Sequence, residues 1–364
     1  MSSSTADRFI DAAGRPWVWI FRRLRSMPSQ RLGETVRLQQ RAHERAMVLI
    51  RVFYALSLMW TVHQMGGWPG LREVPFIDPQ WPAAWIDESD PGSGISLILL
   101  IFGFASLLVA MWPTSRILRA LFTVGMLQYL SVKFGFGKVN HDYHAWLWVS
   151  AILVFLPSGS RMREPSAPDR HATLAVLWSA QIVVLFFYTL TGLWKVYYGL
   201  QAFTNDRISS FQIDGFSLIV AERLLSTAQA TLLGEFLVRN PILGWLLFNG
   251  TMYLECASLL AAFRPRLHRL WGGGLILFHL GTQLAMGFTF VPNIALIGLL
   301  FMASPWAPDR PPIRSVVLDL PGVHLVAKRW RALQRASAAA TATVMARSTA
   351  STLAARSGVS ASER

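Results

Sequence analysis

The sequence predicts an all-α polytopic membrane protein with about eight transmembrane helices and one interfacial or re-entrant outer helix. Its composition, the grouping of its apolar residues and the placement of its charges predict this class. Of the 364 residues, 53% are hydrophobic and 15% are charged, whereas soluble domains carry about 25% charged residues. The apolar residues form long blocks, which excludes an ordinary soluble enzyme and a disordered chain. The single cysteine, Cys256, excludes a disulfide framework and a cysteine-based metal cage.

Eight apolar blocks are candidates for membrane segments, because a hydrocarbon core of about 30 Å takes about 20 residues at about 1.5 Å each. Pro113 ends the second block and Pro157 ends the fourth, since proline removes a backbone donor and breaks a helix. The fifth block is long enough to cross with a tilt, and the eighth is short. In order, the blocks cover residues 46–65, 95–112, 117–136, 143–156, 173–198, 241–263, 270–290 and 291–304.

The basic residues orient these segments, because Lys and Arg collect on the cytoplasmic side of short loops. The N-terminal arm is rich in arginine, so it is expected inside. Alternation then places the basic loops at 116–119, 161–170 and 264–269 inside as well, together with the C-terminal tail. The acidic loop after the first block falls outside. We therefore expect a multi-pass protein of a bacterial inner membrane with both termini cytoplasmic.

Three regions follow from this pattern. Residues 1–45 form a basic cytoplasmic amphipathic arm, residues 46–304 the transmembrane domain, and residues 305–364 a basic cytoplasmic tail that is largely disordered. The segment 211–238 is apolar but carries charges, which predicts the interfacial or re-entrant outer helix over a cavity. The net charge of +14 is explained by orientation and by lipid headgroups, so membrane lipids are expected partners and nucleic acid is not.

Ionisable residues at membrane depth mark the candidate site. The predicted topology places Asn140, His141, His144 and Lys195 at the same outer depth. Lys195 lies among apolar residues, and loss of hydration would favour a neutral amine that acts as a base. The alternative is that Lys195 extends its ammonium to the outer headgroups.

The other ionisable residues have simpler interpretations. His141 and His144 are three residues apart and share one helical face. This spacing permits two metal ligands, but the chain offers no third at a known distance, so we expect no metal. A hydrogen-bonded helix start or a proton relay is the preferred role. Glu255 and His279 are interpreted as a buried polar pair or an interhelical contact rather than as catalytic groups.

Three stretches in order resemble a known family. The first is Asn-His-Asp-Tyr at 140–143, followed by an apolar span that ends in Phe-Leu-Pro at 155–157. The second runs from Gln181 through Tyr188 and Gly192 to Lys195. The third is Phe-His-Leu-Gly-Thr at 278–282, with Met-Gly at 286–287 and Pro-Asn at 292–293. Together they resemble the membrane part of vitamin K-dependent γ-carboxylase and its bacterial relatives, the HTTM (horizontally transferred transmembrane) proteins.

The resemblance implies that Lys195 is the base that deprotonates a reduced quinone, such as menaquinol or a vitamin K-like quinol, with His141 in support. It also implies contacts to that cofactor from the following residues: Asn140, Tyr143, His144, Tyr188 and His279. The substrate would be a small molecule or peptide on the outer side. The alternative hypothesis is a non-catalytic accessory, immunity or lipid-binding module on the same helices. A transporter is disfavoured, because the chain shows no inverted repeat.

Overall fold

The computed structural model describes residues 29–67, 80–87, 90–136, 143–159, 162, 164–205, 207–288, 290–309 and 311–323, with side chains from residue 38 onward. Their regular secondary structure is entirely helical. Four helices are long and apolar enough to cross a membrane: α2 (Ser29–Gly67), α3 (Pro91–Met111), α4 (Arg116–Phe134) and α7 (Ala167–Thr204). The predicted all-helical class and its membrane character are confirmed to this extent. Most of the predicted arm and tail lies outside the described residues.

The remaining predicted spans correspond to helices that are shorter or interrupted, except α12 (His268–Met286), which is as long as α4 but is not among the four apolar spanning candidates. α5 (His144–Leu153) has 10 residues, so it is about 15 Å long, half the thickness of a hydrocarbon core. α10 (Pro241–Cys256) is separated from α11 (Ser258–Ala262) at Ala257. After η3 (Pro265–Leu267), α12 ends at Met286 and is capped by Gly287. The last segment divides into α13 (Val291–Ile297) and the π-helix η4 (Gly298–Met302), and α14 (Ile313–Asp319) follows.

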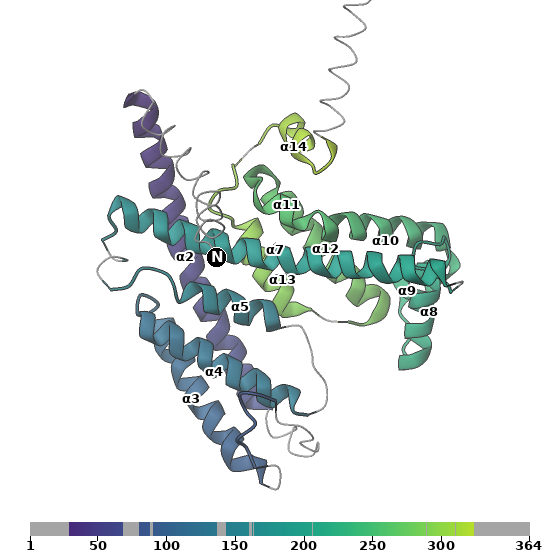
Figure 1. Cartoon of the computed structure of the whole chain (residues 1–364), viewed down its shortest axis with the longest axis horizontal. Helices are drawn as coiled ribbons and strands as arrows, with labels where there is room; N and C mark the ends of the chain where they lie inside the picture. Colours follow the sequence, from purple (N-terminus) through teal and green to yellow (C-terminus); the bar gives the residue numbers. More distant parts are fainter. Residues whose placement is uncertain are drawn as a thin grey trace, which may run out of the picture.

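The helices form two groups that meet along α7 (Figure 1). In the first group, α2, α3 and α4 pack together, and α5 contacts both α4 and α7. In the second group, α7 packs against α10 and α11, and α12 contacts α10, α11 and η4. Figure 1 shows α3 and α4 running at a steep angle to α7 and α10. The two groups therefore differ in direction, and α7 makes most of the contacts between them, with smaller ones from α2 to η4 and from α5 to α13.

Aromatic rings fill the core of the first group. Phe53 of α2 stacks on Trp146 of α5 with centroids 5.0 Å apart, and Phe102 of α3 stacks on Tyr129 of α4 at 5.5 Å. Gly125 permits this contact, because a Cβ there would lie 3.0 Å from the Phe102 ring. The Trp146 indole N–H donates to Ser57 Oγ at 2.8 Å, so its polar atom is satisfied inside the core.

Arg119 belongs to a basic pair that the charge pattern placed in a cytoplasmic loop, but its side chain is fully buried in α4. One guanidinium nitrogen donates to Pro113 O at 2.7 Å, and the other donates to Leu156 O at 2.6 Å and Pro157 O at 3.1 Å. These carbonyls follow the ends of α3 and α5, where backbone acceptors lack helical partners. Arg119 therefore connects the turn after α3 to the turn after α5.

The predicted outer helix over 211–238 is in fact two helices, α8 (Gly215–Thr227) and α9 (Leu232–Arg239). Ala228 adopts a left-handed conformation (φ 49°) at the end of α8, and Thr231 caps α9 by accepting from Gly234 N at 3.1 Å. Both helices pack against α10 and α12. The prediction rests on the apolar but charged composition of 211–238, which does not indicate the turn at Ala228.

Candidate functional site

Lys195 and Glu255 form an ion pair between α7 and α10. Lys195 Nζ donates to both carboxylate oxygens of Glu255 at 2.7 Å. The Glu255 side chain is 1% exposed, whereas that of Lys195 is 35% exposed. The carboxylate is thus inside the protein, and the ammonium reaches it from a partly open side.

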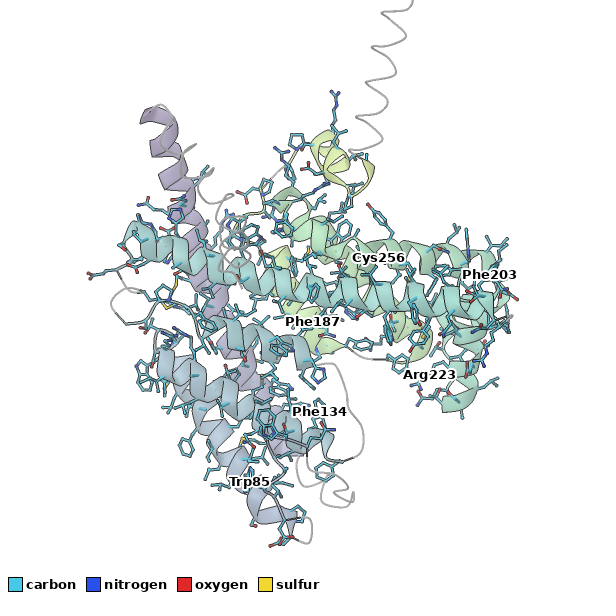
Figure 2. All side chains as sticks on the ribbon, in the orientation of Figure 1. Trp85, Phe134, Phe187, Phe203, Arg223 and Cys256 are labelled. Carbon is cyan, nitrogen blue, oxygen red and sulfur yellow. The ribbon has the colours of Figure 1, made fainter. Side chains whose placement is uncertain are left out.

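Gly192 brings the two helices close enough for this pair to form. A Cβ at Gly192 would lie 2.8 Å from the backbone nitrogen of Cys256 and 2.9 Å from Glu255 Cβ. A side chain of any size would therefore push α10 away from α7. Figure 2 shows Cys256 on α10 beside the middle of α7. The glycine that the family resemblance includes has a packing role here.

Thr189 fixes the other side of Glu255. Its hydroxyl donates to the backbone carbonyl of Glu255 at 3.3 Å and accepts from Leu259 N at 2.9 Å. These bonds satisfy backbone groups at the interruption between α10 and α11, where the helical pattern is broken. The break after Cys256 and the position of the carboxylate are therefore coupled.

A second polar pair lies one helical turn away from Gly192. The Tyr188 hydroxyl of α7 and Nε2 of His279 in α12 are 2.5 Å apart in a hydrogen bond. His279 is 4% exposed, and its other ring nitrogen, Nδ1, has no hydrogen-bond partner among the described residues. The imidazole ring packs against Phe290, with centroids 5.0 Å apart.

The two polar pairs form one cluster. Tyr188, Gly192 and Lys195 are spaced at i, i+4 and i+7, so they share one face of α7. Phe278 of α12 lies between the pairs: its ring centroid is 5.3 Å from Lys195 Nζ and 4.9 Å from the ring centroid of His279. The cluster therefore combines a carboxylate, an ammonium, a phenol and an imidazole around an aromatic ring.

The other predicted site residues either contact the first helix group or lie outside the described residues. His141 and Asn140 lie outside the described residues. Tyr143 contacts the first helix group, with its ring 4.5 Å from Lys133 Nζ and 4.6 Å from the Trp60 ring. The His144 ring packs edge-on against Phe134 at 5.2 Å. α5, which begins at His144, reaches α7 through Trp148 and Phe187, whose rings are 6.4 Å apart.

The expected interpretation of Glu255 and His279 as buried interhelical contacts is only partly what the structure shows. Both are buried and both bond across helices, but Glu255 pairs with Lys195 and His279 pairs with Tyr188. Sequence reasoning missed the carboxylate as the partner of the amine, although Glu255 is the single acidic residue in the apolar block 241–263. Within the described residues, no group of three His, Cys, Asp or Glu side chains gathers to hold a metal ion.

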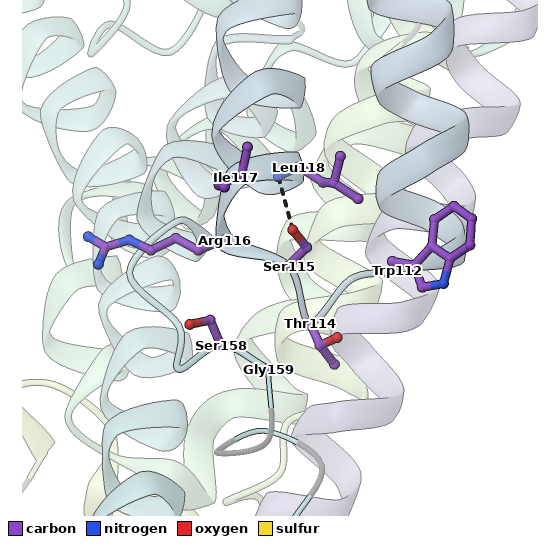
Figure 3. Close-up of a pocket in the computed structure, with 8 residues that line it drawn as sticks. All are labelled: Trp112, Thr114, Ser115, Arg116, Ile117, Leu118, Ser158 and Gly159. Carbon is purple, nitrogen blue, oxygen red and sulfur yellow. Dashed lines mark hydrogen bonds between the residues drawn. The ribbon is translucent and has the colours of Figure 1, made fainter.

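A separate hollow of about 510 Å³ lies between the α3–α4 turn and the turn after α5 (Figure 3). Its lining includes the exposed Arg116 and Ser115, whose hydroxyl accepts from Leu118 N at 3.4 Å and caps α4. None of its lining residues belongs to the polar cluster. The hollow and the cluster are therefore distinct features.

Comparison of the chain with protein-family models, with curated proteins and with solved structures finds no match.

Proposed function

We propose that the chain is an integral membrane enzyme whose proton-transfer site consists of Lys195, Glu255, Tyr188 and His279. The observation that carries this proposal is the bidentate pair between Glu255 on α10 and Lys195 on α7, a helix long and apolar enough to cross a membrane. Charged residues in membrane segments are costly and mark functional pathways. The amine is one half of an ion pair rather than an isolated base. We therefore treat Lys195 and Glu255 as one proton-accepting unit, in which Nζ and the carboxylate share a proton.

The exposure of the cluster supports a site that a substrate can reach. The one-third exposed Lys195 is the accessible member, and Glu255 lies behind it. His279 offers a buried Nδ1 without a partner among the described residues, and an unsatisfied buried polar atom costs about 1–3 kcal/mol. A ligand hydroxyl or carbonyl would satisfy it.

A reduced quinone fits these groups, and the resemblance to vitamin K-dependent γ-carboxylase and HTTM proteins favours it. Phe278 and Phe290 provide aromatic surface beside His279, and Lys195 and His279 provide polar contacts for ring oxygens. When bound, a quinol supplies a hydroxyl proton and two electrons for reaction with oxygen. Lys195 and Glu255 would take up the proton, while Tyr188 holds His279 in position. His141, Asn140, Tyr143 and His144 are proposed contacts by resemblance alone.

The experiment is to reconstitute the full chain in lipid nanodiscs with menaquinol and oxygen and to measure quinone epoxide. We expect epoxide from the wild type and a loss of at least tenfold in Lys195→Met. Arg51→Met is the matched control, because Arg51 is also a basic residue in an apolar spanning helix but is exposed on α2. Absence of epoxide from the wild type with a series of quinols would refute the quinol activity.

A second candidate function is a non-catalytic membrane module, and the ion pair itself favours it. Lys195 and Glu255 connect α7 to α10, so in this hypothesis they stabilise the contact between the two helices and take no part in a reaction. The charge swap Lys195→Glu with Glu255→Lys separates the two hypotheses. A purely stabilising pair is expected to tolerate the swap, whereas a proton-transfer site with the carboxylate behind the amine is expected to lose activity while the protein stays folded.

The proposed topology keeps eight membrane segments with both termini cytoplasmic in a bacterial inner membrane. In support, the basic loops alternate with the apolar blocks. In a Cys256→Ala background, single cysteines at 45 and 309 are expected to react with a membrane-impermeant maleimide only after the cells are opened. A cysteine at 87 is expected to react in intact spheroplasts. Labelling of 45 in intact spheroplasts would contradict this orientation.

A further inference from the structure

The tip of the α8–α9 hairpin exposes large apolar side chains. Leu225, in the last turn of α8, is 82% exposed, and Leu232, the first residue of α9, is 93% exposed. The two leucines flank the turn that joins the helices, so they belong to the same tip. Figure 1 shows α8 running at a steep angle to α7 and α10, at the end of that helix pair.

Residues 224–234 at this tip carry no charge, and the charges that flank them are the exposed Glu222 and the residues Arg223, Glu235 and Arg239. Arg223 turns toward the protein, with its guanidinium 4.1 Å from the Phe288 ring centroid and Nε donating to Met286 O at 3.4 Å. Glu235 pairs with Arg239 on the next turn of α9 at 3.7 Å. Between Arg223 and Glu235 the tip therefore presents only apolar and uncharged polar groups.

The contacts of the hairpin place its tip beside the end of α12. Thr231 Oγ1 donates to Ala285 O at 2.9 Å, and a Cβ at Gly234 would lie 2.5 Å from that same carbonyl oxygen. α12 ends one residue later at Met286, and the chain reverses at Gly287 (φ 72°). Leu284, which precedes Ala285 in α12, is a further exposed apolar side chain (62%). The tip thus lies at the level where α12 ends.

We propose that the α8–α9 tip inserts Leu225 and Leu232 into the boundary between headgroups and hydrocarbon in the leaflet next to the end of α12. A bilayer is the occupant that this surface fits, because residues 224–234 are uncharged, their leucines are exposed and the chain has four helices long and apolar enough to cross a membrane. The hairpin packs against α12 and bonds to it through Thr231, so its insertion would set the depth of that helix and of His279 within it.

The test uses the full chain in nanodiscs, with Cys256→Ala and one introduced cysteine that carries an environment-sensitive NBD fluorophore. The tip positions are Leu225→Cys and Leu232→Cys. Leu284→Cys is the control for lipid contact, and Arg314→Cys on α14, which is exposed and basic, is the control for water. Quenching is measured with lipids that carry a nitroxide near the top of the acyl chain and, separately, with aqueous iodide.

We expect both tip positions to be quenched by the nitroxide lipid at least threefold more than position 314, with blue-shifted emission and weak iodide quenching. Strong iodide quenching with nitroxide quenching equal to that at position 314 would overturn the proposal, because the tip would face water. Protection from both quenchers would also overturn it, since the tip would then contact protein, such as a second copy of the chain.

Discussion

Lys195 Nζ lies 2.7 Å from each carboxylate oxygen of Glu255, although the two residues are 60 positions apart in the chain. The pair is asymmetric, because the carboxylate is buried and the amine is partly open. Gly192 makes the close approach possible, and Thr189 secures the backbone beside the carboxylate. This asymmetry gives the two partners different energetic and chemical roles.

Removing the amine is expected to destabilise the protein more than removing the carboxylate. Lys195→Ala strands a buried carboxylate, and breaking one side of a buried pair costs about 3–5 kcal/mol. Glu255→Ala leaves an amine that can turn toward its open side, so the expected loss is about 1–2 kcal/mol after allowance for solvent screening. Thermal unfolding in nanodiscs measures both. Equal losses, or the reverse order, would contradict the asymmetry.

Gly192→Ala is expected to lower the stability by about 1–3 kcal/mol, the usual cost of overpacking. The added methyl group would meet the backbone of α10, which cannot move like a flexible side chain. Gly250→Ala on α10 is the matched control, since a Cβ there has no neighbour within 4 Å. That control is expected to be neutral or stabilising by up to about 1 kcal/mol. Unfolding midpoints compare the two, and similar effects would argue against the close approach.

Arg119→Met is expected to destabilise the first helix group by about 3 kcal/mol. Three backbone carbonyls lose their donor, and each unsatisfied buried group costs about 1–3 kcal/mol. Arg116→Met tests the matched position, because Arg116 is exposed and has only a distant contact with the Phe155 ring at 5.9 Å. Limited proteolysis after Arg116→Met should match the wild type, and that after Arg119→Met should be faster. Equal cleavage rates for Arg119→Met and wild type would disprove this connection.

Asp309 gives a pH-dependent contact between α2 and α12. Arg45, which donates to its carboxylate at 3.3 Å, and Arg269 at 3.4 Å lower the pKa of Asp309 below its ordinary value. The folded carboxyl therefore binds its proton more weakly than the unfolded one. Its contribution is present above the unfolded pKa, about 3.9, and disappears as the pH falls through the lower, folded pKa.

The measurement is the difference in Tm between wild type and Asp309→Asn. We expect the wild type to be slightly more stable at pH 7 and this advantage to shrink below about pH 4. Glu235→Gln, in an exposed pair on α9, is the control for general acid effects. A Tm difference that stays constant from pH 7 to pH 3 would show that Asp309 contributes nothing through its charge.

The sequence predicts the all-helical class and the four long apolar helices, because apolar blocks of about 20 residues favour helices of that length. Block length does not indicate that the block 241–263 is interrupted or that α5 is short. The end of α3 and the start of α4 follow from Pro113 and from the serine cap at Ser115. The interruption at Ala257 and the π-helix η4 could not be predicted, because both depend on tertiary hydrogen bonds. Gln181, for example, donates to Leu300 O within η4 at 2.5 Å across 119 residues.

The candidate site was only partly predictable for a similar reason. Lys195, Tyr188 and His279 were identified from the residues and the motif resemblance, but no local pattern indicates which helices bring them together. Glu255 pairs with Lys195 because Gly192, which lacks a side chain, lets α10 approach α7. That contact joins positions far apart in the sequence. The buried role of Arg119 was also hidden, since an arginine near a turn is usually assigned to the water-facing surface.

The most direct test of the central claim replaces the ion pair with apolar residues of similar size, Lys195→Met with Glu255→Leu. Such a replacement of a buried pair is often neutral or stabilising, so the variant is expected to fold with a Tm near that of the wild type. Quinol-dependent epoxide formation is then measured beside the wild type in nanodiscs. A folded variant that has lost turnover is the predicted result, and a folded variant that retains wild-type turnover would contradict the proton-transfer role of Lys195 and Glu255.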